Sequence, residues 1–369
     1  METKKTTLFE SLEKQGGKMV PFAGYYLPIK FISELKEHKN VRDNAGLFEV
    51  SHMGEIFILG KNALNFCQFI TSNDVSLLKN QDVQYTVILN ENACAVDDAT
   101  LFKFNDEKYM FCVNAANIDK DYNHFLSYQD KFENVIIENK SECTDMLACQ
   151  GPKSKKILQK LTDYNLDNLS FFTFASMSLA GVEVVVSRTG YTGELGYEIT
   201  ARPEKTKHLF SAIMEAGQEH ELQLIGLGAR DTLRLEMGMI LYGNDLDETK
   251  TPIEASLRWC TKADKPEFLG KDIITKQLEN KPKIKLVGLE MIDRGIPRQG
   301  CKILWEDTEV GYVTSGSFSP TLGYGIAMAY IDSSFYKIGR KFKIDIRGKK
   351  LVAKTTKFPF INTKFEYKN

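Results

Sequence analysis

The order of strand-like and helix-like segments constrains the fold of this chain more than any other feature of its sequence. Strand and helix patterns are mixed, but they do not follow the strict alternation that builds a doubly wound parallel sheet. The pattern runs to about residue 144 and then starts again. From about residue 284 it changes to short strands with glycine-rich turns, which is typical of a small antiparallel barrel or sandwich. The predicted fold class is therefore α+β.

Both cycles predict elements of ordinary length. In the first cycle we expect helices in 31–44, 62–74 and 117–129, and strands in 83–90, 95–104 and 108–115. The segment "GLFEVSHMGEIFILG" (46–60) alternates like a strand pair. In the second cycle we expect a strand in 144–151, a hairpin in 181–201, and helices in 152–161, 205–217 and 229–240.

Length and charge exclude several classes of protein. The 369 residues suffice for two or three domains with well-buried cores. The 48 basic and 49 acidic residues argue against partners such as nucleic acid or an anionic membrane, which need a basic excess. No apolar run approaches the length of a membrane span, and the N-terminal stretch resembles neither a secretory signal nor a transit peptide. We therefore expect a cytoplasmic protein.

The cysteines do not indicate a metal site or a disulfide framework. They form no CxxC pair, their number is odd and their neighbours are apolar, so we expect reduced thiols in the core. The seven are Cys67, Cys94, Cys112, Cys143, Cys149, Cys260 and Cys301.

Two adjacent acids stand inside a predicted strand, "ACAVDDATLF" (93–102). Strands disfavour Asp, and a buried charge is costly unless a neighbouring group compensates it. Successive strand residues point to opposite faces, so Asp97 and Asp98 should face apart and should not share one site. The pattern does not say which of the two has a function.

The segment "SRTGYTGELGYEI" (187–199) has a glycine at every third position from Gly190 to Gly196. Such spacing allows sharp turns or close approach to a ligand. One interpretation is a hairpin with a solvated Glu198. The other is a ligand-binding wall in which Glu198 accepts paired N–H donors and Tyr191 is a further polar group.

A second glycine-rich segment, "GLGARDTLRLEMGM" (226–239), leads into a predicted helix with Arg230 in its first turn. A helix N-terminus favours anions, and an arginine there can bind a carboxylate through two hydrogen bonds. The alternative is a surface salt bridge of Arg230 or Arg234 with Asp231 or Glu236.

Three weaker signals remain. His52 in "VSHMGE" (50–55) is either a catalytic base or a hydrogen-bonded structural residue, and Met53 follows it. Asn114 ends a predicted strand, where its default role is a helix cap or a turn. On composition alone, "TSGSFSPTLG" (314–323) is a simple polar connection.

Taken together, these segments match one family in order along nearly the whole chain. The matching pieces are "KMVPFAGYYLPI" (18–29), "VSHMGE" (50–55), "VDDATLF" (96–102), "VNAANIDKDY" (113–122), "ACQGPKS" (148–154), "SRTGYTGELGYEI" (187–199), "GLGARDTLRLEMGMILYGNDLDE" (226–248) and "VTSGSFSPTLG" (313–323). The chain resembles the T-protein family of the glycine cleavage system, the tetrahydrofolate-dependent aminomethyltransferases.

The resemblance implies a three-domain cloverleaf around a central folate channel. The first domain would combine 1–51 with 145–275, an inserted second domain would span 52–144, and a C-terminal antiparallel β-barrel would span 284–369. It also implies the reaction. A lipoylated H protein presents an aminomethyl group, and the enzyme transfers its carbon to the cosubstrate tetrahydrofolate, giving ammonia and 5,10-methylene-tetrahydrofolate. No metal and no pyridoxal phosphate take part in that step.

Residue roles carry over by position. Asp98 would be the catalytic carboxylate beside the reactive folate nitrogens, which leaves Asp97 on the opposite face in a structural role. Glu198 would pair with the aminopyrimidine edge of the pterin, and Arg230 would meet the glutamate tail. Met53, Tyr85, Asn114 and Tyr191 would line the folate pocket.

The chain departs from the family pattern at a few positions. Ala93-Cys94 replaces a common Gly-Gly pair, Ala99 replaces a common Leu, and Phe365 aligns with an aromatic hydroxyl that contacts folate in some members. Two alternatives remain within the superfamily, a folate-dependent demethylase and a non-catalytic folate-binding protein that aids iron–sulfur assembly. The second has a cysteine-containing glycine-rich motif, whereas 187–199 contains no cysteine.

Overall fold

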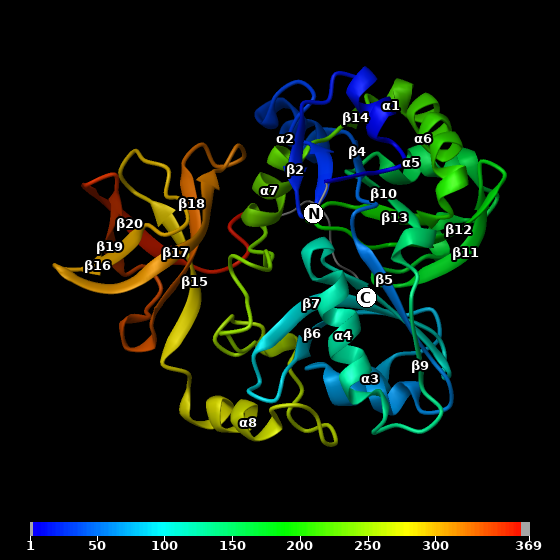
Figure 1. Cartoon of the computed structure of the whole chain (residues 1–369). Helices are drawn as coiled ribbons and strands as arrows, with labels where there is room; N and C mark the ends of the chain where they lie inside the picture. The colour runs from blue at the N-terminus through cyan, green and yellow to red at the C-terminus, as the bar shows by residue number, and fades with distance from the viewer. Residues whose placement is uncertain (1–2, 363–369) are drawn as a thin grey trace.

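The computed structural model describes residues 3–362 and arranges them as three lobes (Figure 1). Each lobe is built on its own sheet, and a fourth, small sheet lies near the N-terminus. This small sheet has the order β1-β3-β2 and contains β1 (Lys4–Lys5), β2 (Met19–Phe22) and β3 (Tyr25–Pro28). Among the described residues, no helix is both long and apolar enough to cross a membrane.

One lobe contains a six-stranded sheet of order β11-β12-β13-β10-β4-β14, whose strands come from two separate parts of the chain. The strands are β4 (Gly46–Glu49), β10 (Asp145–Gln150), β11 (Phe174–Leu179), β12 (Val182–Ser187), β13 (Gly196–Ala201) and β14 (Gln223–Leu224). The helices of this lobe are α1 (Phe9–Lys14), α2 (Glu34–Asp43), α5 (Ser154–Leu158), α6 (Pro203–Gly217) and α7 (Leu227–Glu236).

The second lobe contains a five-stranded sheet of order β6-β7-β8-β5-β9. Its strands are β5 (Gly54–Leu59), β6 (Val83–Leu89), β7 (Ala95–Asn105), β8 (Lys108–Val113) and β9 (Ile136–Asn139). Helices α3 (Ala63–Ile70) and α4 (Ile118–Gln129) pack on this sheet, where Phe66 and Phe125 are completely buried.

The prediction that 46–60 forms a strand pair is wrong in its pairing. Both strands exist, but β4 pairs with β10 in one sheet and β5 pairs with β8 in the other. The segment Ser51–Met53 between them carries the chain from one lobe to the next instead of reversing it. Alternation predicts a strand but does not say which strand will pair with it.

The third lobe follows α8 (Lys271–Asn280) and is a closed six-stranded barrel, which confirms the antiparallel barrel expected at this end of the chain. Its strands are β15 (Ile284–Met291), β16 (Lys302–Trp305), β17 (Thr308–Phe318), β18 (Gly325–Asp332), β19 (Lys341–Ile346) and β20 (Lys349–Thr356). Their inward side chains form an apolar core that includes Leu289, Val313 and Ile344.

A buried carboxylate ties the barrel to the first lobe. Glu236, at the end of α7, accepts hydrogen bonds from Arg42 at 2.9 Å, from the Ser319 hydroxyl at 2.5 Å and from the Thr321 hydroxyl at 2.8 Å. His38 Nε2 lies 3.2 Å from the same carboxylate. Segment 314–323 is therefore more than a simple connection, because its hydroxyls dock the barrel onto α7.

Candidate functional site

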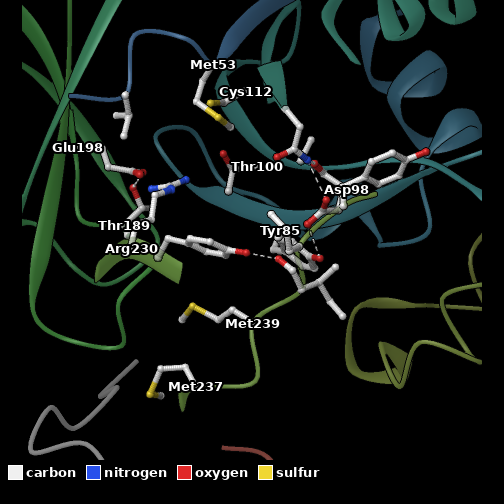
Figure 2. A pocket seen from close by; sticks show the side chains of 18 of the residues that line it. Met53, Tyr85, Asp98, Thr100, Cys112, Thr189, Glu198, Arg230, Met237 and Met239 are labelled. Atoms are coloured by element: carbon white, nitrogen blue, oxygen red, sulfur yellow. Dashed lines mark hydrogen bonds between the residues drawn. The ribbon is translucent and has the colours of Figure 1, made fainter. Parts of the chain in front are cut away.

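A cavity of about 530 Å³ lies where the three lobes meet. All seven site residues predicted from the sequence line it, and each comes from a different element or loop. They are Met53 after β4, Tyr85 of β6, Asp98 of β7, Asn114 after β8, Tyr191 between β12 and β13, Glu198 of β13 and Arg230 of α7. Figure 2 shows Asp98 and Tyr85 on one side of the cavity and Glu198 and Arg230 on the other.

Asp98 is held by two side-chain donors. Tyr85 Oη donates to Oδ2 at 2.8 Å, and Asn114 Nδ2 donates to Oδ1 at 2.9 Å. Burial and the neighbouring charge of Asp97 raise the pKa of Asp98 to about 7, against the lowering effect of these hydrogen bonds. A carboxylate with a pKa near 7 is suited to accept a proton at neutral pH.

Asp97 and Asp98 face apart as strand geometry predicts, because Asp98 lines the cavity and Asp97 is completely buried behind it. The two carboxylates nevertheless have one hydrogen-bond donor in common, which the sequence pattern did not predict. Asn114 Nδ2 lies 2.8 Å from Asp97 Oδ1 as well as 2.9 Å from Asp98 Oδ1. The reason is that Asn114 directly follows β8, the strand that pairs with β7, so its amide lies beside both acids.

Glu198 has one oxygen engaged and one available to the cavity. Thr189 donates a hydrogen bond to Oε2, whereas Oε1 accepts none from the described residues. Burial raises the pKa of Glu198, while Thr189 and the charge of Arg230 lower it. The alternative of a solvated hairpin glutamate is wrong, since the side chain is partly buried in the cavity wall.

The two arginines of α7 have different partners. Arg230 stacks over the Tyr191 ring at 4.7 Å and faces the cavity, and its guanidinium makes no hydrogen bond or ion pair with the described residues. Arg234 is 2% exposed and pairs with Asp231 at 2.7 Å and with Asp245 at 2.8 Å. The salt-bridge alternative therefore holds for Arg234, whose guanidinium is buried, and not for Arg230.

His52 and Tyr191 shape the cavity wall. His52 is buried with its ring edge against Phe22, and burial together with the charge of Arg230 lowers its pKa to about 3. The imidazole is therefore neutral and a poor proton acceptor at neutral pH, so the catalytic-base alternative is not supported. Tyr191 donates its hydroxyl to the carbonyl of Ile240, which leaves its ring for contacts.

Sequence reasoning missed Trp259. This indole is 61% exposed, yet it lines the cavity and stacks on Tyr85 with ring centroids 5.5 Å apart at an angle of 18°. It lies in the short 3-10 helix η7 (Arg258–Cys260), inside a stretch with no periodic pattern. A rare aromatic residue in a loop was the available signal, because loops often carry binding residues.

Several smaller expectations can be compared with the structure. Ala93 adopts a φ of +60°, the left-handed conformation that glycine takes most easily, so the turn before β7 has a glycine-like shape without glycine. Cys67, Cys112, Cys149 and Cys260 are buried as expected, but Cys143 is exposed and Cys94 and Cys301 are partly exposed. Phe365 lies outside the described residues. Within residues 3–362, no cluster of three or more His, Cys, Asp or Glu side chains is arranged to hold a metal ion.

Comparisons with known proteins agree with this arrangement. Residues 8–265 match the family model of the GCVT N-terminal domain, and residues 285–362 match that of the glycine cleavage T-protein C-terminal barrel domain. The chain is 49% identical over 351 residues to the aminomethyltransferase of Thermoanaerobacter sp. strain X514, covering 95% of each chain. It is 45% identical over 360 residues to that of Lysinibacillus sphaericus, covering 97% of this chain and 98% of the other.

A solved structure gives the same result in three dimensions. The glycine cleavage system aminomethyltransferase T from Bartonella henselae superposes with a TM-score of 0.92 at 30% identity, covering 99% of each chain. The fold and both domain matches lead to one conclusion: this chain belongs to the glycine cleavage T-protein family, the aminomethyltransferases.

Proposed function

We propose that this protein transfers the one-carbon unit of an aminomethyl group from the lipoyl arm of an H protein to tetrahydrofolate, with release of ammonia. The observation that carries this proposal is Asp98, a carboxylate with a pKa of about 7 on the wall of a cavity large enough for a folate. The membership of the chain in the glycine cleavage T-protein family supports the same reaction. We place the reaction in the cytoplasm.

Asp98 would act at the reacting atoms. Loss of ammonia leaves a cationic carbon, and the negative charge of Asp98 stabilises that cation. A folate nitrogen then donates its electron pair to the carbon and loses a proton, which Asp98 accepts. The second folate nitrogen then attacks the same carbon and displaces the dihydrolipoyl sulfur as a thiolate, which takes the proton that this nitrogen loses and leaves as a thiol. Tyr85 and Asn114 keep the carboxylate oriented through their hydrogen bonds.

The opposite side of the cavity would hold the folate. The free Oε1 of Glu198 is suited to accept an N–H group from the aminopyrimidine edge of the pterin. Arg230, which has no ion-pair partner among the described residues, would bind the glutamate tail. The side chains of Met53 and Tyr191 supply apolar contact area between these polar groups.

A coupled assay tests the proposal. Purified protein, aminomethylated lipoyl H protein and tetrahydrofolate should release ammonia, and Asp98→Asn should lower that rate by about 10²–10⁴-fold while leaving folate binding intact. Asp307→Asn, an exposed change in the barrel, is the charge-matched control. Absence of ammonia release from the wild-type protein, together with turnover of a methylated amine, would assign the chain to the demethylase activity instead.

A further inference from the structure

A second carboxylate lies directly behind the proposed catalytic one. Asp97 has no exposed surface and accepts three hydrogen bonds from N–H groups. Asn114 donates its backbone N–H at 3.0 Å and its Nδ2 at 2.8 Å, and Asn117 Nδ2 donates at 2.7 Å. Among the described residues no cation pairs with Asp97. These three donors favour the ionised form of this buried group.

A third carboxylate completes the cluster from the neighbouring helix. Asp121 of α4 is also fully buried, and neither of its oxygens receives a hydrogen bond from an N–H or O–H group of another described residue. Asp97 is the neighbouring carboxylate whose negative charge acts on Asp121. Two neighbouring carboxylates that are both completely buried, and one of which has no hydrogen-bond donor, cannot both stay ionised, so one of them must hold a proton.

The proton belongs on Asp121. Asp97 already has three N–H donors that stabilise its negative charge, whereas Asp121 has none, and burial together with the charge of Asp97 raises the pKa of Asp121 well above its usual range. The charge of Lys120 lowers the pKa of Asp121 but does not outweigh these effects. Lys120 interacts with Tyr242 at 2.8 Å, and the Tyr242 hydroxyl donates to the Ala95 carbonyl at 3.0 Å.

Asn114 connects this pair to the cavity. Its two amide hydrogens serve Asp97 and Asp98 together, so the amide nitrogen, and not the amide oxygen, must face both acids. Resting on the proposed function, we propose that Asp97 and Asp121 form a buried acid pair holding a single proton, and that this pair positions Asn114 toward Asp98 and places one fixed negative charge behind it.

The fixed charge has a defined effect on the reaction. The negative charge of Asp97 disfavours ionisation of Asp98 and so raises its pKa. Tyr85, Tyr191 and Cys260 also interact with Asp98, and each has a pKa raised first by burial and is neutral near pH 7. Asp98 is thereby kept a stronger base than an ordinary aspartate, and a base of that strength accepts a proton more readily at neutral pH.

Isosteric substitutions separate the two acids. Asp121→Asn replaces a neutral donor with a neutral donor, so the acidic limb of the pH profile for ammonia release should not move. Asp97→Asn removes the fixed charge, lowers the pKa of Asp98, and should move that limb to lower pH by about one unit. Asp119→Asn, an exposed change in the same first turn of α4, is the control and should leave the limb in place.

A spectroscopic readout makes the test independent of activity. The infrared spectrum of the wild-type protein at pH 8 should contain the carbonyl band of a protonated carboxylic acid that Asp121→Asn lacks and Asp119→Asn retains. The proposal is overturned if that band does not differ, if Asp121→Asn moves the limb as far as Asp97→Asn does, or if Asp97→Asn leaves the limb in place. Should Asp97→Asn not fold, the band and the Asp121→Asn profile decide. Failure of the wild-type protein to release ammonia at any pH would instead count against the proposed function.

Discussion

The Tyr85 hydroxyl donates to Oδ2 of Asp98 at 2.8 Å, across two paired strands of one sheet. This hydrogen bond lowers the pKa of Asp98, against the larger raising effect of burial. In Tyr85→Phe the pKa of Asp98 should rise, so the acidic limb of the activity profile should move to higher pH by about one unit.

Tyr85→Phe should move the acidic limb to higher pH and Asp97→Asn should move it to lower pH. The two variants therefore test whether the pKa of Asp98 sets this limb. The measurement is the initial rate of ammonia release between pH 5 and 9 (roughly the range that spans the pKa of a tuned carboxyl). Tyr312→Phe, a change at a residue 41% exposed on the barrel, is the control. An unmoved limb in Tyr85→Phe would show that the hydrogen bond does not tune Asp98.

Trp259 should report binding in the cavity. The chain has two tryptophans, and the other, Trp305, packs in the barrel against Phe342. In a Trp305→Phe variant the remaining fluorescence comes from the indole stacked on Tyr85, and a bound pterin ring close to that stack should quench it. Titration with tetrahydrofolate gives the binding curve. Quenching that persists in Trp259→Phe and disappears in Trp305→Phe would place the ligand elsewhere.

The sequence predicted most elements of this fold, because each depends on local periodicity. It predicted the strand around Asp98 and the barrel strands, and the family resemblance selected seven residues that all line one cavity. What it missed depends on contacts between distant segments. The partner of β4, the Asn114 bridge between two acids and the stack of Trp259 on Tyr85 all join residues separated by many positions. No local pattern records such contacts.

Glu236 should determine how firmly the barrel is held. Burial raises its pKa, but the hydrogen bonds and charges of His38 and Arg42 and the Ser319 hydroxyl outweigh burial and lower the pKa to about 2. Glu236→Gln removes one of the two buried carboxylates that pair with Arg42, while Glu194 still pairs with it at 3.1 Å, so the free energy of unfolding at pH 7 should fall by about 1–3 kcal/mol. Urea denaturation measures this loss. Glu219→Gln, at an exposed surface pair with Lys160, should leave the unfolding midpoint unchanged.

The lowered pKa of Glu236 also predicts how its contribution to stability changes with pH. A group whose pKa is lower in the folded state stabilises the protein above its unfolded pKa, and that contribution is lost as the pH falls through the folded value. For Glu236 the loss should extend from about pH 4.5 to about pH 2. The difference in unfolding free energy between the wild-type protein and Glu236→Gln should therefore shrink across that window. A difference that stays constant down to pH 2 would mean that Glu236 is not ionised in the fold.

Arg230 and Arg234 lie one turn apart on α7, and their contacts predict opposite phenotypes. Arg230 faces the cavity and has no hydrogen-bond or ion-pair partner for its guanidinium among the described residues, only the stack on Tyr191, so Arg230→Gln should weaken folate binding by about 1.5–3 kcal/mol with little change in the unfolding temperature. Arg234→Gln should lower the unfolding temperature and change folate binding little, because it leaves Asp245 buried without its cation. Isothermal titration and thermal unfolding of both variants distinguish these outcomes.

A truncated ligand then identifies the group that Arg230 binds. Tetrahydropteroate lacks the glutamate tail. If Arg230 binds that tail, removing the tail and removing the guanidinium should each lower the affinity by the same amount. Removing both should lower the affinity no further, because they are the two partners of one interaction. Arg230→Gln should bind tetrahydropteroate as tightly as the wild-type protein does. Arg230 lies beside Glu198 in the cavity, so it could instead contact the pterin (Figure 2). A loss of affinity for tetrahydropteroate in Arg230→Gln would assign Arg230 to a pterin oxygen, next to the edge that Glu198 binds.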